Sequence, residues 1–170
     1  MKKIRIIFLL SIIIILTACV FGSCALPSSD EYLRLHVRAN SDSEKDQRIK
    51  YEVKDEIVSV LAVILKDANG FDQAVEKASG AIAELEYQAD CFLKSKGFSY
   101  GVEITLQKES FPTRVYENYT LPAGEYVALI VALGEGKGQN WWCVAYPPLC
   151  FSGGGKQITY KSKLLEILGF

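Results

Sequence analysis

The chain has 170 residues, a formal net charge of -1 and a sequence pI of about 5.9. A charge balance this close to neutral argues against a nucleic-acid partner, because phosphate backbones are bound through a strong basic field. About 140 residues follow an apolar N-terminal segment, and that length suits one domain with its own hydrophobic core. We expect this domain to span residues 32–151, between a linker at 26–31 and a glycine-rich hinge with a short tail at 152–170.

The N-terminus has the pattern of a membrane-targeting segment. The cationic Met1–Arg5 precedes an apolar run from Ile6 to Leu16, and these are the two halves of a secretory signal. Residues 1–25 are therefore predicted to be a signal peptide or a membrane anchor. In either case the positive flank stays inside and the rest of the chain is exported, so that only this segment contacts the membrane.

Three fates of the targeting segment stay open. Ser23-Cys24-Ala25 offers small residues to a type I signal peptidase, whereas Leu16-Thr17-Ala18-Cys19 resembles a bacterial lipobox that would lipidate Cys19. Retention as an anchor through residues 6–26 is the third, because about twenty residues at about 1.5 Å each span a bilayer. We favour removal slightly over retention.

The exported part contains three cysteines, in a compartment where disulfides are permitted. Cys143 and Cys150 flank the bend at Pro147-Pro148, and a bridge between them is the preferred pairing. Cys91 lies in a helical pattern and is predicted to be a small buried hydrophobe. Three free thiols are the alternative.

Residues 32–39 are predicted to form the first strand. Apolar and polar side chains alternate there with the period of a half-buried strand. The apolar face is expected to pack on the core, while the opposite face carries Arg34, His36 and Arg38. On that polar face, His36 is expected to be solvated or paired with Asp42 or Asp46.

Two helices are predicted to follow this strand. A capping box, either Ser41 with Glu44 or Ser43 with Asp46, precedes a helical pattern over residues 44–66. A second helical pattern begins at Phe71 and ends at Gly97, after a last turn that carries two lysines.

The second half of the domain is predicted to be rich in strands. Period two returns at residues 100–107, and residues 108–120 are expected to be irregular. Residues 125–133 are almost wholly apolar, which is typical of a central strand covered on both faces. The glycine-rich segment 134–140 is expected to be a hairpin connection into a strand at 141–146, which Pro147-Pro148 ends.

This order of elements, β-α-α-β-β-β, predicts an α+β fold. We expect a single domain with one mixed or antiparallel sheet and two helices packed on one face. Because neighbouring strand residues face opposite sides, one of Trp141 and Trp142 is expected in the core and the other exposed. An exposed tryptophan beside a glycine loop is a common anchor for a protein partner, and less often a platform for a sugar.

Few groupings of residues suit catalysis. A single histidine and the lack of a Cys-x-x-Cys pair argue against a zinc site, and no Gly-x-Ser-x-Gly motif occurs. The glycine-rich loop lacks the spacing and the following helix of a phosphate-binding loop, so no cofactor or metal is expected. The sharpest enzymatic alternative is a thiol hydrolase with Cys143 as nucleophile, His36 as base and Asn140 as orienting residue. A strand position and a bridge to Cys150 both argue against it.

Three blocks of sequence carry a family resemblance. Residues 35–50 read LHVRANSDSEKDQRIK, residues 111–116 read FPTRVY, and residues 121–151 contain LPAGEY, LGEGKGQNWWCV and PPLCF. Placed in this order behind an export segment, the blocks cover most of residues 32–151 and resemble the stage II sporulation protein R family.

The resemblance implies a signal in endospore formation. Members of this family are made in the forespore and exported into the intermembrane space between the two septal membranes. There they activate a membrane-embedded aspartic protease of the mother cell at its extracellular face, and that protease cleaves the pro-form of sigma-E. The resemblance therefore implies an activator that is not itself a catalyst.

Two surfaces are the expected contacts of such an activator. The strand-to-helix corner comprises His36, Arg38, Asn40, Asp42, Asp46 and Gln47. The loop comprises Gly134, Gly136, Lys137, Gly138 and Asn140, with whichever of Trp141 and Trp142 is exposed. Phe111, in the second block, is a further candidate. The alternative from another class is a cell-wall-binding module or wall enzyme in the septal space.

Overall fold

A computed structural model describes residues 31–116 and 119–149 of the chain. The targeting segment, Cys150 and the tail at 152–170 lie outside these residues, and so do the cleavage and lipidation sites. Within the described ranges no helix is both long enough and apolar enough to cross a membrane.

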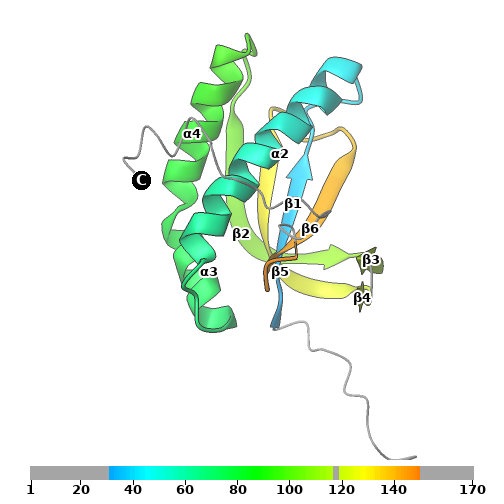
Figure 1. The fold of residues 1–170 in the computed structure, drawn as a ribbon. Helices are drawn as coiled ribbons and strands as arrows, with labels where there is room; N and C mark the ends of the chain where they lie inside the picture. The colour runs from blue at the N-terminus through cyan, green and yellow to red at the C-terminus, as the bar shows by residue number, and fades with distance from the viewer. Residues whose placement is uncertain (1–30, 117–118, 150–170) are drawn as a thin grey trace, which may run out of the picture.

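A four-stranded mixed sheet forms the centre of the described part, in the order β2-β5-β1-β6 (Figure 1). Strand β1, Leu33–Arg38, runs parallel to β5, Gly124–Leu133, and antiparallel to β6, Asn140–Tyr146. Strand β2, Val102–Phe111, pairs antiparallel with β5 along its whole length. The predicted mixed sheet and α+β class are confirmed.

The helices of the described part cover one face of this sheet (Figure 1). Helix α2, Glu44–Leu65, confirms the first predicted helix. The second predicted helix is two helices, α3 at Phe71–Gly80 and α4 at Ile82–Ser95, which meet at Ala81. Apolar spacing did not reveal this break, because the break is one residue long and the buried residues keep their helical spacing on both sides of it. The prediction of two helices was therefore one short.

Two connections differ from the sequence prediction. The segment between β5 and β6 is not a hairpin, because β1 lies between these two strands. Residues 108–120 are not irregular: β2 continues to Phe111, and β3 at Arg114–Tyr116 pairs antiparallel with β4 at Tyr119–Leu121. This two-stranded ribbon projects from one end of the sheet, away from the helices (Figure 1).

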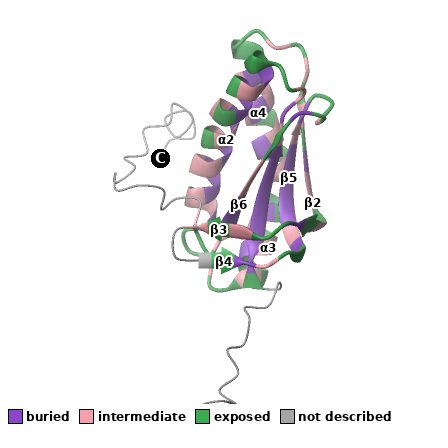
Figure 2. Cartoon of the chain, turned by 90° about the vertical axis from the view of Figure 1, so that its right-hand side faces the viewer, coloured by how far each residue is buried: buried purple, intermediate pink, exposed green. Residues whose placement is uncertain are grey.

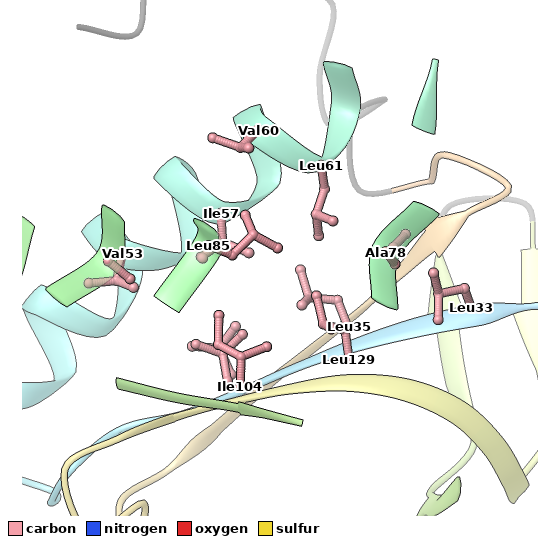
Figure 3. Close-up of a cluster of buried hydrophobic side chains, with 14 of the residues drawn as sticks. Leu33, Leu35, Val53, Ile57, Val60, Leu61, Ala78, Leu85, Ile104 and Leu129 are labelled. Atoms are coloured by element: carbon pink, nitrogen blue, oxygen red, sulfur yellow. The ribbon is translucent and has the colours of Figure 1, made fainter. Parts of the chain in front are cut away.

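The main core lies between the helices and the sheet (Figure 3). Leu35 of β1 and Leu129 of β5 are fully buried there, beneath Ile57 and Leu61 of α2 and Leu85 of α4. This arrangement confirms the predicted apolar face of the first strand. Cys91 of α4 does not join the core, because its side chain is exposed, so its predicted burial was wrong.

A second, smaller cluster covers the opposite face of the sheet, which is called the outer face below. Its buried residues are Tyr32, Phe111, Leu121, Tyr126, Ala128, Ile130 and Val144. Strand β5 is therefore buried on both sides, as its apolar run predicts (Figure 2). The same cluster buries Arg34 and His36, which were expected on a solvated face.

Replacement of Ser43 by alanine is expected to lower the free energy of unfolding by about 1 kcal/mol. The Ser43 side chain caps α2 by accepting a hydrogen bond from the backbone N–H of Asp46, at 3.2 Å. Ser59→Ala is the matched control, because Ser59 lies inside α2 and bonds only its own helix backbone. Urea denaturation should leave Ser59→Ala within about 0.5 kcal/mol of wild type, and equal losses for both variants would contradict the capping role.

Candidate functional site

The two surfaces expected from the sequence form one corner of the molecule. Because β1 lies between β5 and β6, the loop at residues 134–139 crosses over the end of β1. The backbone N–H of Gly138 donates to the carbonyl of Ala39 at 2.8 Å, and that of Lys137 donates to the carbonyl of Asn40 at 3.3 Å. The strand-to-helix segment and the glycine loop are thus joined by main-chain hydrogen bonds into a single unit, called the corner below.

Side chains of the corner hold the loop in place. Asn40 Oδ1 accepts from the backbone N–H of Glu135 at 3.0 Å, and Asp42 Oδ1 accepts from that of Gln139 at 2.7 Å. Neither residue caps α2, because Ser43 does so. Asn40 and Asp42 therefore fix the shape of the loop, which leaves less of their hydrogen-bonding capacity for a partner.

Asp46 lies at the centre of the corner and is 7% exposed. Its carboxylate accepts hydrogen bonds from Asn40 Nδ2 at 2.8 Å, Ser41 Oγ at 2.6 Å and the Tyr100 hydroxyl at 2.7 Å. Burial acts to raise the pKa of Asp46, but these hydrogen bonds outweigh it and lower that pKa below its ordinary value. Asp46 therefore ties α2 to the segment that follows β1 and to the segment that precedes β2, as a buried anion.

Lys50 completes the corner and was not found from the sequence. It is 1% exposed, and its ammonium group donates to Gln47 Oε1 at 2.7 Å and to the carbonyl of Gln139 at 3.0 Å. Burial lowers the pKa of Lys50, and the negative charge of Asp42 opposes that shift. From the sequence, a lysine in an amphipathic helix is expected to face solvent. The contact of Lys50 with the loop becomes visible only because the loop crosses over the start of α2.

Two glycines permit this close approach. A Cβ on Gly134 would lie 2.3 Å from Asn40 Oδ1, at a φ of +56° that favours glycine. A Cβ on Gly138 would lie 2.2 Å from the backbone oxygen of Ser41. The loop then presents Glu135, Lys137, Gln139 and Asn140 as exposed side chains, with an ion pair of 2.8 Å between Lys137 and Glu135.

On the outer face, His36 has a partner that the sequence did not indicate. Its Nδ1 lies 2.7 Å from Glu109 Oε2, and Arg38 pairs with the other oxygen of the same carboxylate. The expected pairing with Asp42 or Asp46 is therefore wrong. Glu109 was missed because β2 was predicted to end before it.

The pairing of β1 with β6 separates the two side chains that a thiol hydrolase would need close together, Cys143 and His36. In the β1–β6 register His36 is opposite Trp142, while Cys143 is opposite Leu35, so the histidine and the cysteine point to opposite faces of the sheet. Cys143 is also 5% exposed. Its bridge to Cys150 stays a prediction, since Cys150 lies outside the described residues.

Arg34 is fully buried on the outer face, a second feature missed from the sequence. Its Nε donates to the carbonyl of Cys143 at 3.1 Å, and its Nη2 donates to the Tyr116 hydroxyl at 3.0 Å. The guanidinium also lies 4.2 Å from the ring centre of Phe111. Phe111 is itself 2% exposed, so this candidate contributes by holding Arg34 rather than by facing solvent.

Both tryptophans are half-buried, on opposite faces of β6. Trp141 packs against the main core, with the Lys54 ammonium 5.1 Å from its ring centre. Trp142 stacks on His36 at 5.4 Å, and the Arg114 guanidinium lies 4.1 Å from its ring centre. The expectation of one core and one exposed tryptophan was therefore wrong, because Trp142 packs against the second cluster on the outer face and contacts Arg114.

A comparison with known protein families gives a match that includes all of the described residues. A family model described as "Stage II sporulation protein R (spore_II_R)" matches residues 29–155. The chain belongs to the stage II sporulation protein R family. The match includes the whole corner and the whole sheet, which confirms the resemblance read from the three sequence blocks.

One relative in this family is the stage II sporulation protein R of Bacillus subtilis (strain 168). It is 37% identical over 122 residues, which cover 72% of this chain and 54% of the relative. The chain thus spans about half the length of that curated relative. No solved structure matches the chain.

Proposed function

We propose that the chain is an intercompartmental signal of sporulation stage II. In this proposal it is exported from the forespore into the intermembrane space and activates the mother cell's membrane-embedded aspartic protease, which then cleaves pro-sigma-E. The single observation that carries the proposal is the family match over residues 29–155. The cationic and apolar N-terminus of the chain, typical of an export signal, supports the location.

The corner suits a docking role because it is rigid before any partner binds. Main-chain and side-chain hydrogen bonds hold the loop on Ala39, Asn40 and Asp42, so little conformational entropy is lost when the exposed loop side chains meet a partner. A ligand activates a protease only if it binds the active state more tightly. Tenfold activation needs about 1.4 kcal/mol of differential binding, which a few such contacts supply.

The alternatives have less support from the structure. A thiol hydrolase needs Cys143 and His36 on one side of the sheet, and they lie on opposite sides. A wall-binding module was suggested by an exposed tryptophan, but both tryptophans are half-buried, and the Trp142 ring is in contact with His36 and Arg114. Activation by binding is therefore the function that we adopt.

The test is to produce the full chain together with the protease and its pro-sigma substrate in a host that does not sporulate. Conversion of the pro-form to the shorter form, followed on a gel, is expected only when chain and protease are both present. No conversion above background would overturn direct activation.

Within that assay, Glu135→Gln/Lys137→Gln is expected to lower the cleavage rate about fivefold or more, because both side chains are exposed on the corner. Glu52→Gln/Lys96→Gln is the matched control. It removes another surface ion pair, which joins α2 to the C-cap residue of α4 and includes no residue of the loop, and it should cleave at the wild-type rate. Equal losses in both double variants would point to a general effect of surface charge.

A further inference from the structure

We propose that the outer face of the sheet, where Arg114 stacks on Trp142 beside the buried Arg34 and His36, is a docking site for an acidic segment of a protein partner. This inference deepens the proposed function, on which it rests for the partner's identity: the acidic segment would belong to the extracellular part of the protease. The ligand chemistry is a carboxylate on a polypeptide.

The first observation is a set of nitrogens without partners. Among the described residues, the buried side-chain nitrogens that lack a hydrogen-bond partner are Arg34 Nη1, His36 Nε2 and Arg114 Nε. All three belong to the cluster around Trp142 and Phe111. Arg34 is fully buried and His36 is 3% exposed. Buried donors are normally satisfied, so their concentration in one place marks a site that the described residues leave incomplete.

The second observation is an excess of positive charge. Glu109 is the carboxylate bonded to this cluster in the described part of the chain, and it is shared by His36 and Arg38. No ion pair of Arg34 or Arg114 occurs among the described residues. Burial lowers the pKa of Arg34, Tyr116 and Tyr126 oppose that shift, and the positive charge of Arg114 adds a smaller lowering. Within residues 31–116 and 119–149, these two neighbouring guanidinium groups therefore have no carboxylate paired with either of them.

The low polarity around these cations strengthens their field. Phe111 and Tyr126 flank the Arg34 guanidinium at 4.2 and 4.9 Å, and Coulomb interactions grow as the surrounding dielectric falls. A carboxylate that approached the half-buried edge of Arg114 would gain the attraction of both guanidinium groups. It would also lessen the repulsion between them, so binding would favour an anion over a neutral group.

The third observation is that the contact residues are already in position. The Trp142 ring contacts both His36, at an interplanar angle of 27°, and the Arg114 guanidinium, which lies 4.1 Å from its ring centre. Tryptophan and arginine are the residues most enriched at the energetic centres of protein interfaces. Arg114 lies on β3, which projects beyond the sheet (Figure 1), and its neighbour Val115 is 70% exposed. The site thus offers a cation and an apolar rim to an acidic segment.

The binding test uses the full chain in detergent micelles and a fluorescein-labelled hexaglutamate peptide, followed by fluorescence anisotropy. The peptide should bind wild type, and Arg114→Gln should weaken binding about tenfold. Arg48→Gln is the matched control, because Arg48 is an exposed guanidinium on α2 that is paired with Glu44. Thermal unfolding of Arg114→Gln checks that the fold is retained.

Several outcomes of this assay would overturn the site. They are the absence of binding to wild type, equal losses in Arg48→Gln and Arg114→Gln, and displacement of the peptide by inorganic phosphate at an equal concentration of charge. The last result would show a site for a free anion rather than for an acidic polypeptide. Labelled hexaglutamine, which lacks the charge, should not bind.

The co-production assay then separates the site from the proposed function. If wild type triggers cleavage and Arg114→Gln does so at less than about a fifth of its rate, the protease uses this surface. Equal cleavage by both would overturn the assignment of the surface to the protease and leave the proposed function standing. If wild type itself triggers no cleavage, the proposed function fails, and the peptide assay alone decides whether the face binds acidic segments.

Discussion

Gly138→Ala is expected to lower the free energy of unfolding by about 3 kcal/mol. The added Cβ would lie 2.2 Å from the backbone oxygen of Ser41 and 2.9 Å from the Ala39 Cβ. Backbone cannot rotate out of the way as a flexible side chain does, so the loop must separate from the end of β1. That movement would break the hydrogen bond from Gly138 to Ala39. The measurement is urea denaturation followed by circular dichroism.

Gly80→Ala is the control for this substitution. Gly80 ends α3, and a Cβ there meets nothing within 4 Å, so alanine should leave stability unchanged or raise it by up to about 1 kcal/mol. If Gly138→Ala were as stable as Gly80→Ala, the close packing of the loop on the strand end would be wrong. Because the corner is the proposed docking unit, Gly138→Ala should also lower cleavage in the co-production assay.

Asp46→Ala is the second change with a large expected effect, a loss of about 3 kcal/mol in the free energy of unfolding at pH 7. The substitution leaves three donors, on Asn40, Ser41 and Tyr100, without their acceptor. Asp55→Ala is the control on the same helix, because the Asp55 carboxylate is 70% exposed. Its ion pair with Lys54 involves this solvent-exposed carboxylate and contributes little, so Asp55→Ala should stay within about 0.5 kcal/mol of wild type.

The effect of Asp46 should depend on pH with a definite sign. Its pKa in the folded protein is lower than in the unfolded chain. Its stabilising contribution is therefore complete above the unfolded-state pKa of about 3.9 and is lost as pH falls through the lower folded-state pKa. The stability difference between wild type and Asp46→Ala should be constant from pH 7 to about 5 and shrink below about 4. A difference that grew on acidification would contradict an ionised Asp46 in the folded state.

Both substitutions act on the corner, although through different contacts. Five of the residues first proposed as partner contacts divide into two groups. Asn40, Asp42 and Asp46 hold the loop, while Lys137 and Asn140 are exposed. Variants in the first group should lose stability together with activity, whereas variants in the second should lose activity alone. Measuring both stability and activity therefore distinguishes residues that hold the loop from residues that contact the partner.

Local patterns in the sequence were enough to predict β1, α2 and β5, the strands and the helix that surround the corner. Alternation in residues 32–39, the cap before α2, its apolar spacing and the apolar run of β5 each depend on neighbouring residues alone. The family blocks likewise identified the family, because they are contiguous stretches. The break at Ala81 escaped this reasoning, since apolar spacing reports the buried side of a helix and not its hydrogen bonds.

Pairing between distant segments was decided only by the tertiary structure. The insertion of β1 between β5 and β6 converts an expected hairpin into a crossing loop and so merges the two candidate surfaces. The β3–β4 ribbon and the second cluster bury a face that alternation had marked as solvated, which brings Arg34, His36 and Glu109 together. Alternation says which side chains share a face, but not what covers that face. The covering residues lie roughly 70 to 110 positions away along the chain, and their free energy of burial depends on contacts that no local pattern records.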